Sequence, residues 1–385
     1  MSARIFLVAA EASGDALGAD LVRALRAREP DAKLAGVGGA QMAEEGIATQ
    51  ADISGLAVLG FVDGLLAYSR VKRAVAATVN AILKAQPDVV VLIDSWGFTL
   101  RVAQGVRAAA PHIKLVKYIG PQVWATRPGR AKTLAATVDH LICIHDFEAP
   151  FYEPYGLSCT VCGHPALGRF QPGDGAALRA RAGFTPREKI ILVLPGSRAS
   201  EIRRIGPTLW QAAELLDRDR DVRILVVAAG SVSKQVVEQA PAAVRIIDER
   251  EKEDAFAAAT VALAASGTVT TEVALQGTPL VIGYKLGWIT WAIARALLFK
   301  GKYATLMNVA ADAEVAPEFI QTRFTAQNIA AAAAPLLDDE SAREEQVRRQ
   351  DEALAKMGRG GRPAAEIAAD AVLGVLAQPR LPSAT

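Results

Sequence analysis

Short apolar runs alternate with longer segments of helical spacing along most of the chain. In the first half, the apolar runs predict strands at residues 5–10, 34–37, 89–94, 115–119 and 140–144. After the first run, apolar residues recur every three or four positions, which predicts a helix over residues 16–28. Strands that are apolar on both faces and separated by helices are typical of a parallel sheet covered by helices.

The pattern breaks once and then repeats. Residues 163–189 are rich in glycine, proline and charge, which is typical of a connection between domains. Beyond this segment, strands are predicted at residues 190–194, 222–228, 244–247, 261–265 and 279–284. Residues 325–378 are predicted to be helical, with a break at GRGGRP (358–363) and a last helix at 364–377.

We therefore predict two doubly wound, Rossmann-like α/β domains that face a cleft. The expected parts are an N-terminal domain, a linker, a C-terminal domain and C-terminal helices, over residues 1–165, 166–188, 189–350 and 351–385. The last helix is expected to pack back on the first domain. In doubly wound folds, ligands bind beyond the carboxyl ends of the strands, so the candidate chemistry should lie in the loops at those ends.

Composition narrows the class of protein. The chain has 385 residues, of which 51% are hydrophobic, and a net charge of +2, which lacks the basic bias of nucleic-acid-binding proteins. Its three cysteines favour a reducing compartment. Cys159 and Cys162 form a CxxC pair, interpreted as part of an apolar strand, with a metal or redox site as the alternative. We find no signal peptide or membrane-spanning run and expect a cytoplasmic location.

A loop of the second half has the features of an anion site. The segment LPGSRASEI (194–202) follows a predicted strand and leads into a predicted helix. Gly196 permits a close backbone approach, Ser197 and the helix start offer N–H groups, and Arg198 adds a forked cation suited to phosphate. Glu201 can cap the helix or orient Arg198. The alternative is a Pro-Gly turn with a surface arginine.

A second loop of the same kind follows in ASGTVTTE (265–272). Ser266, Gly267 and Thr268 can donate hydrogen bonds to a diphosphate, and Glu272 can bind ribose hydroxyls. The alternative is a helix-capping serine with a surface acid. Two such loops in one domain predict a nucleoside diphosphate site there.

The candidate residues in the first half of the chain are mainly carboxylates, in contrast to the anion-binding loops of the second half. Asp94 ends a predicted buried strand, where it can act as a general base or merely cap the next helix. Glu11 and Asp15 lie in the loop EASGDALG after the first strand and argue against a phosphate site there. Trp124, in a loop with Arg127 and Arg130, suits an anionic or sugar ligand or is simply a packed aromatic.

Together these segments resemble the lipid-A-disaccharide synthase family, glycosyltransferases of family 19 with the GT-B fold. The resemblance covers most of the chain and combines an early E-x-SGD, LPGSRxxE and SGTxxxE. It rests on EASGDALGADL (11–21), LAVLGFVD (56–63), PDVVVLID (87–94), PQVWA (121–125), GHP (163–165), LPGSRASEI (194–202), ASGTVTTE (265–272), VIGYK (281–285), KYATLMNV (302–309) and PEFIQ (317–321).

The resemblance implies an inverting, metal-independent transfer with no cofactor. Such enzymes join UDP-2,3-diacylglucosamine to 2,3-diacylglucosamine 1-phosphate, releasing UDP and a β-1′,6-linked disaccharide 1-phosphate. It makes Asp94 the expected base and Arg198 the residue that stabilises the leaving UDP. The expected donor-binding residues are Gly196, Ser197, Arg198, Glu201, Ser266, Gly267, Thr268, Glu272, Tyr284 and Asn308. The expected acceptor-side residues are Glu11, Ser13, Gly14, Asp15, Gln122 and Trp124.

Lipid substrates would also explain two apolar segments that carry basic residues. Residues 55–79 and 286–303 can lie in a membrane interface or cradle acyl chains, or they are core helices. We accordingly expect peripheral association with the cytoplasmic face of the inner membrane, acylated sugar partners, no nucleic acid, and leave a homodimer open.

The chain departs from the usual family pattern at residues 96–99, 126, 145–148 and 307–314. These departures concern the acceptor and donor sides. A GT-B paralogue with another donor or acceptor, a UDP-sugar 2-epimerase, and a silent binding protein are therefore the alternatives.

Overall fold

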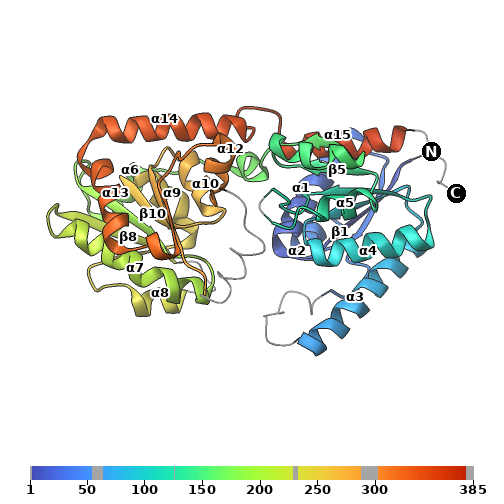
Figure 1. Cartoon of the computed structure of the whole chain (residues 1–385), viewed down its shortest axis with the longest axis horizontal. Helices are drawn as coiled ribbons and strands as arrows, with labels where there is room; N and C mark the ends of the chain where they lie inside the picture. Colours follow the sequence, from blue (N-terminus) through green and yellow to red (C-terminus); the bar gives the residue numbers. More distant parts are fainter. Residues whose placement is uncertain (1, 54–63, 125, 229–232, 288–301, 379–385) are drawn as a thin grey trace. The chain divides into compact units, whose positions relative to one another are not determined.

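The computed structural model describes residues 2–53, 64–124, 126–228, 233–287 and 302–378, and Figure 1 shows the chain. The chain divides into two compact units. Unit 1 comprises Met1–Pro165 and Gly361–Thr385, and unit 2 comprises Ala166–Gly360. Each unit contains a six-stranded sheet in which every strand pair is parallel. The prediction of two doubly wound α/β domains is confirmed.

The sheet of unit 1 has the order β2-β1-β3-β4-β5-β6. Its strands are β1 (Arg4–Ala9), β2 (Lys33–Val37), β3 (Val89–Ile93), β4 (Lys114–Tyr118), β5 (His140–Cys143) and β6 (Ser158–Val161). Strand β6 contains Cys159, in agreement with the strand interpretation of the CxxC pair. The strand order reverses between β1 and β3. Doubly wound sheets bind ligands in the crevice beyond the carboxyl ends of the two strands at such a reversal.

Helices cover both faces of this sheet. One core packs against α1 (Ala12–Arg28), α2 (Ala40–Glu44) and α15 (Ala364–Ala377). The other packs against α3 (Gly64–Ala85), α4 (Trp96–Ala109) and α5 (Arg130–Ala135). Two short 3-10 helices, η1 (Asp146–Phe151) and η2 (Glu153–Tyr155), precede β6.

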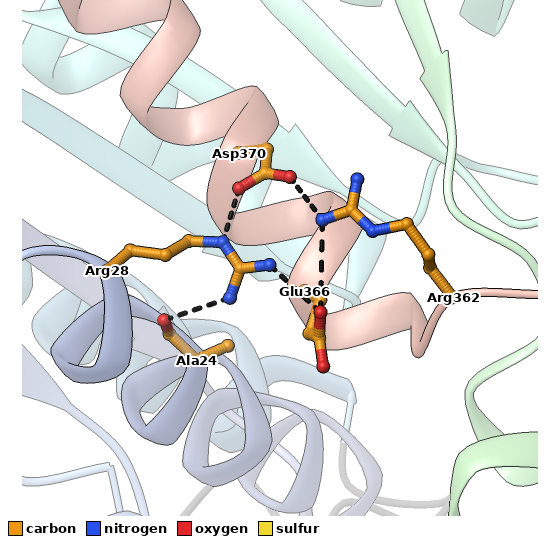
Figure 2. Close-up of polar contacts among 5 residues, drawn as sticks. All are labelled: Ala24, Arg28, Arg362, Glu366 and Asp370. Atoms are coloured by element: carbon orange, nitrogen blue, oxygen red, sulfur yellow. Dashed lines mark hydrogen bonds and ion pairs between the residues drawn. The ribbon is translucent and has the colours of Figure 1, made fainter.

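Helix α15 returns from the end of the chain to pack beside α1, as predicted. Ala368 and Val372 are fully buried against the sheet. Figure 2 shows the polar side of this contact, where the Arg28 guanidinium donates to the carboxylates of Asp370 and Glu366, the latter at 3.0 Å. Arg362 also pairs with Asp370. Apolar burial and an ion-pair cluster thus both attach the last helix to unit 1.

The sheet of unit 2 has the order β12-β11-β10-β7-β8-β9. Its strands are β7 (Lys189–Leu194), β8 (Val222–Ala228), β9 (Arg245–Asp248), β10 (Val261–Ala265), β11 (Leu280–Tyr284) and β12 (Glu318–Ile320). One face is covered by α7 (Ala199–Asp217), α8 (Ser233–Gln239) and α13 (Ala326–Asp338). The other is covered by α6 (Gly175–Ala182), α9 (Lys252–Ala258), α10 (Val269–Leu275), α12 (Leu306–Ala311) and α14 (Glu340–Lys356).

Two parts of the expected domain division differ from the structure. Residues 166–188 are more than a linker, because they include α6, which packs on α9 through the buried Leu178 and belongs to unit 2. Residues 351–385 are divided, because α14 lies in unit 2 and only α15 lies in unit 1. The side-chain amide of Gln350 on α14 donates to the carbonyl of Thr278, which ties α14 to the loop before β11.

Among the helices of the described residues, none is long and apolar enough to cross a membrane. Of the two apolar segments singled out in the sequence, residues 55–63 and 288–301 lie outside the described residues. The described remainder of the first segment forms part of α3, on which Arg70, Lys72 and Arg73 are exposed.

Candidate functional site

A cavity of about 350 Å³ lies at the carboxyl ends of β7 and β10 in unit 2. Both predicted loops line it, and so do three residues of the segment 249–256. The lining residues are Leu194, Pro195, Gly196, Ser197, Arg198, Glu201, Val227, Glu249, Lys252, Phe256, Ala265, Ser266, Gly267, Thr268, Val269 and Glu272. The structure thus brings together eight of the ten residues expected to bind the donor.

The first loop has a backbone that requires glycine. Gly196 has φ +119°, and a Cβ atom there would lie 2.7 Å from Glu201. The Glu201 carboxylate accepts a hydrogen bond from Ser197 N at 3.2 Å and pairs with Arg198 at 3.0 Å. Glu201 therefore orients Arg198, one of the two roles considered for it, and also bonds the loop backbone at Ser197, which precedes the N-cap of α7. The Arg198 side chain is 77% exposed, which leaves most of its guanidinium open to the cavity and solvent.

The second loop places a carboxylate beside a lysine that the sequence analysis missed. Glu272 lies in the first turn of α10 and accepts a 2.7 Å hydrogen bond from Lys252 Nζ. Burial opposes the charge of Lys252, but this bond and neighbouring carboxylates outweigh it and raise the lysine pKa. Lys252 stands in the charged run DEREKED, where nothing in the sequence separates it from a solvated surface lysine. The cavity lining thus includes a second cation in addition to Arg198.

Tyr284 and Asn308 do not line this cavity. Tyr284 ends β11 and is half-buried. Burial raises its pKa, the charge of Glu201 also raises it, and the charge of Arg198 opposes this shift. Asn308 on α12 is fully buried. Its amide oxygen accepts from Val315 N and Ala316 N, and its amide nitrogen donates to Ala316 O. These bonds give Asn308 the role of holding the turn after α12.

In unit 1, the ends of β1 and β3 bring three expected residues together. Ser13 Oγ donates to Asp94 Oδ2 at 3.0 Å, and Ser95 Oγ donates to Glu11 Oε1 at 2.9 Å. Asp94 is partly exposed. The N-cap of α4 is Ser95. The Asp94 carboxylate thus bonds Ser13 in the first turn of α1, which differs from the alternative in which it caps the next helix.

A buried lysine that the sequence analysis also missed lies below Asp94. Lys117 on β4 donates its ammonium to the main-chain carbonyl of Asp94 and, at 3.0 Å, to Thr99 Oγ1. Burial lowers its pKa to about 7, although the charges of Asp94 and Glu11 oppose this shift. The only sequence signal was a lysine inside the apolar run LVKYI.

Asp15 forms its hydrogen bonds inside unit 1. It is buried, and its carboxylate accepts hydrogen bonds from Gly39 N, Gln41 N and Met42 N at 2.7 to 3.2 Å. These bonds hold the start of α2. Gly14 is buried in the first turn of α1, against the ends of β1 and β3.

The other acceptor-side residues lie on the loop after β4. Gln122 is exposed. Trp124 packs edge-on against Phe147 at 5.5 Å, and Phe147 stacks on His145 at 4.9 Å. Trp124 is thus a packed aromatic, with part of its surface exposed.

A buried acid and two histidines follow this aromatic stack. Glu148 accepts from the backbone N–H groups of Ile144 and His145, and its burial raises its pKa to about 7. The ring of His164 lies 6.0 Å from that of His145. Across the described residues, no group of three His, Cys, Asp or Glu side chains could hold a metal ion.

The fold as a whole is similar to those of solved structures. The UDP-GlcNAc 2-epimerase of Neisseria meningitidis, solved with UDP-GlcNAc, aligns with a TM-score of 0.58 over 97% of this chain and 100% of that chain. The identity is 11%, so this likeness concerns the fold alone. Two doubly wound domains in one chain, each with its own parallel sheet, define the GT-B fold class.

The family follows from the sequence comparisons. The profile of the Lipid-A-disaccharide synthetase family matches residues 5–372. The lipid-A-disaccharide synthase of Rhodospirillum centenum is 38% identical over 97% of this chain and 94% of its own length. That of Ruegeria pomeroyi is 39% identical over 96% and 94%. The chain belongs to this family of glycosyltransferases in lipid A biosynthesis, and the expected family is confirmed.

Proposed function

We propose that this chain transfers a 2,3-diacylglucosamine unit from its UDP derivative to 2,3-diacylglucosamine 1-phosphate. The products are UDP and a β-1′,6-linked disaccharide 1-phosphate. The observation that carries the proposal is the unit 2 cavity, where two strand-end loops and two cations converge in a chain of this family. The alternatives of an epimerase or a silent binding protein have no comparable support.

In this proposal the cavity binds the UDP part of the donor. Backbone N–H groups of the loops at Gly196–Ser197 and Ser266–Thr268 bind the diphosphate, and Glu272 binds the ribose hydroxyls. Arg198 stabilises the negative charge that develops on UDP as the glycosidic bond breaks. Since Glu201 already pairs with Arg198, it keeps the guanidinium oriented before the charge develops. Lys252 adds positive charge and holds the Glu272 carboxylate in place.

In unit 1, Asp94 serves as the general base. The acceptor hydroxyl loses its proton to the Asp94 carboxylate as its oxygen attacks the anomeric carbon from the side opposite UDP, which inverts that carbon. The hydrogen bond from Ser13 leaves one carboxylate oxygen of Asp94 for the acceptor. No metal is needed in this scheme, because Arg198, Lys252 and backbone N–H groups supply the positive charge.

The proposed lipid substrates also imply a location. We propose peripheral association with the cytoplasmic face of the inner membrane. The exposed basic residues of α3, Arg70, Lys72 and Arg73, would attract anionic lipid head groups. Co-sedimentation with vesicles that contain anionic phospholipid tests this part, and charge reversal at Arg70 and Arg73 should reduce the bound fraction. Bound protein equal to wild type in that variant would contradict the role of α3.

The decisive experiment follows UDP release from the two acylated substrates without added metal. Wild type should release UDP, whereas Asp94→Asn and Arg198→Ala should each lower kcat by about 100-fold or more. Two matched controls should keep wild-type rates. Asp88→Asn changes a carboxylate at the opposite end of β3, and Arg203→Ala removes an exposed arginine one turn further along α7.

Two outcomes would contradict the proposal. One is the absence of UDP release by wild type, and the other is undiminished turnover by both site variants. Rapid turnover of unacylated UDP-GlcNAc in place of the acylated donor would favour the epimerase or paralogue alternative.

A further inference from the structure

A lysine lies in the interior of unit 1, directly below the turn that carries Asp94. Lys117 is on β4, between β3 and β5, and its exposed fraction is 2%. Its ammonium donates to the Asp94 carbonyl and to Thr99 Oγ1, both on the β3–α4 connection. Burying an ammonium group carries a large desolvation penalty. Packing alone would favour an apolar residue here, so the lysine points to another role.

The turn above Lys117 has an uncommon backbone conformation. Asp94 and Ser95 have φ of 48° and 41°, in the left-handed region that non-glycine residues seldom adopt. Two consecutive residues of this kind persist when neighbouring groups hold them there. The Asp94 carbonyl accepts from Lys117 and, at 2.8 Å, from the Thr99 hydroxyl. The main chain of Asp94 is thus held from below, while Ser13 holds its carboxylate from the α1 side.

We propose that Lys117 is a positioning residue that fixes the Asp94 turn and thereby aims the Asp94 carboxylate at the acceptor hydroxyl. This inference rests on the proposed role of Asp94 as the base. Lys117 contacts only the carbonyl of Asp94 and the hydroxyl of Thr99 among the hydrogen bonds of the described residues. It therefore acts through Asp94 and does not touch substrate. The charged groups that face it are the carboxylates of Asp94 and Glu11, which favour its protonated form.

The substitution Lys117→Met separates positioning from stability. Methionine matches the length of the side chain but removes the charge and the donors. The kcat should fall by about 10- to 100-fold, because the carboxylate loses its fixed orientation. The KM for the UDP donor should stay within about twofold, because the donor cavity lies in unit 2. The melting temperature should not fall, because a buried ammonium has been removed. A residue with a merely structural role would instead lower activity and melting temperature together.

A matched control is available on the same strand. Lys114 lies at the opposite end of β4 and also donates its ammonium to main-chain carbonyls, those of Val375 and Gln378. Lys114→Met removes the same chemistry far along the strand from Asp94 and should leave kcat unchanged. Lys117→Gln keeps a donor for the Asp94 carbonyl and should recover part of the rate lost in Lys117→Met. It also serves as the test variant if the methionine variant does not fold.

A double substitution tests whether Lys117 acts through Asp94. In an Asp94→Asn background, Lys117→Met should cause no further loss of rate, because the group that Lys117 positions is already disabled. An additive loss would overturn the inference, and so would a wild-type kcat in both Lys117 variants. Failure of the proposed function is a separate result, since it would appear as no turnover of the acylated substrates by wild type.

Discussion

Lys117 and Lys252 show that a lysine can bond a candidate site residue and yet carry little signal in the sequence. Each binds a partner far along the chain, Lys117 the carbonyl of Asp94 and Lys252 the carboxylate of Glu272. A lysine in an apolar run and a lysine in a charged run look ordinary until the sheet brings the partners together. Asp94, Arg198 and Glu272 could be predicted as candidates because each stands at a strand end or at a helix start.

The burial of Lys117 predicts a pH dependence of stability. Its pKa falls from 10.5 to about 7 on folding. Between these values the unfolded chain binds a proton that the folded chain has released, so the free energy of unfolding rises with pH. Relative to Lys117→Met, wild type should gain about 2 kcal/mol between pH 7 and pH 9. Urea unfolding of both proteins across this range measures the difference, in which the contribution of unit 2 cancels. A difference that is constant with pH would contradict the shifted pKa.

The pairing of Lys252 with Glu272 predicts an effect on nucleotide binding. Lys252→Met removes a cation from the cavity and the hydrogen bond that holds the Glu272 carboxylate. The Kd for UDP should rise by about 10-fold, as measured by isothermal titration calorimetry. Lys234→Met, at an exposed position of α8, is the control and should bind UDP as wild type does. Equal affinities in the two variants would exclude Lys252 from the site.

At the scale of elements, the strand-end loops were readable from sequence because glycine and small polar residues follow apolar strands directly. Strands β1, β3, β7 and β10 fall where their apolar runs predicted them. Strand β12 and helix α6 were missed, because three residues give no periodicity and α6 lies in a segment rich in glycine and proline. The backbone partners of Asp15 could not be predicted, because they are three N–H groups at the start of α2 and no local sequence pattern indicates such a contact.

The first cavity loop yields a prediction about its glycine. Gly196→Ala places a Cβ atom 2.7 Å from Glu201 at φ +119°, so the loop must shift. We expect about 1 to 3 kcal/mol of destabilisation and a UDP affinity at least 10-fold weaker. Gly267→Ala in the second loop is the control for stability, because a Cβ atom there meets nothing within 4 Å. Thermal melting measures the loss of stability, and titration with UDP measures the loss of affinity. A wild-type melting temperature and a wild-type UDP affinity in Gly196→Ala would contradict a strained loop.

At the scale of the whole molecule, the last helix makes unit 1 discontinuous in sequence. Val372 and Val375 of α15 are buried in its core, and burial of two valine side chains stabilises by about 3 to 6 kcal/mol. The ion-pair cluster of Arg28, Glu366 and Asp370 is partly exposed and adds less. The two ends of the chain therefore fold together, while residues 166–360 form the other unit.

This division predicts the result of a truncation. Removing residues 361–385 should destabilise unit 1 and abolish turnover, while unit 2 should still bind UDP with wild-type affinity. Hydrogen exchange of β1 and β3 amides reports on unit 1, and calorimetry reports on UDP binding. Removing only residues 379–385 is the control and should change neither measurement. Loss of UDP binding in the longer truncation would contradict independent folding of unit 2.

The sequence by itself determined the α/β class, the family, the two cavity loops and the strand-end acid, because each is encoded in consecutive residues. Only the tertiary structure decided that Lys117 lies under Asp94, that Lys252 pairs with Glu272, and that Asp15 and Asn308 are used internally. It also placed α6 in unit 2 and the last helix in unit 1. The physical reason is that a parallel sheet brings residues into contact through crossovers tens of residues long, and local patterns do not specify such contacts.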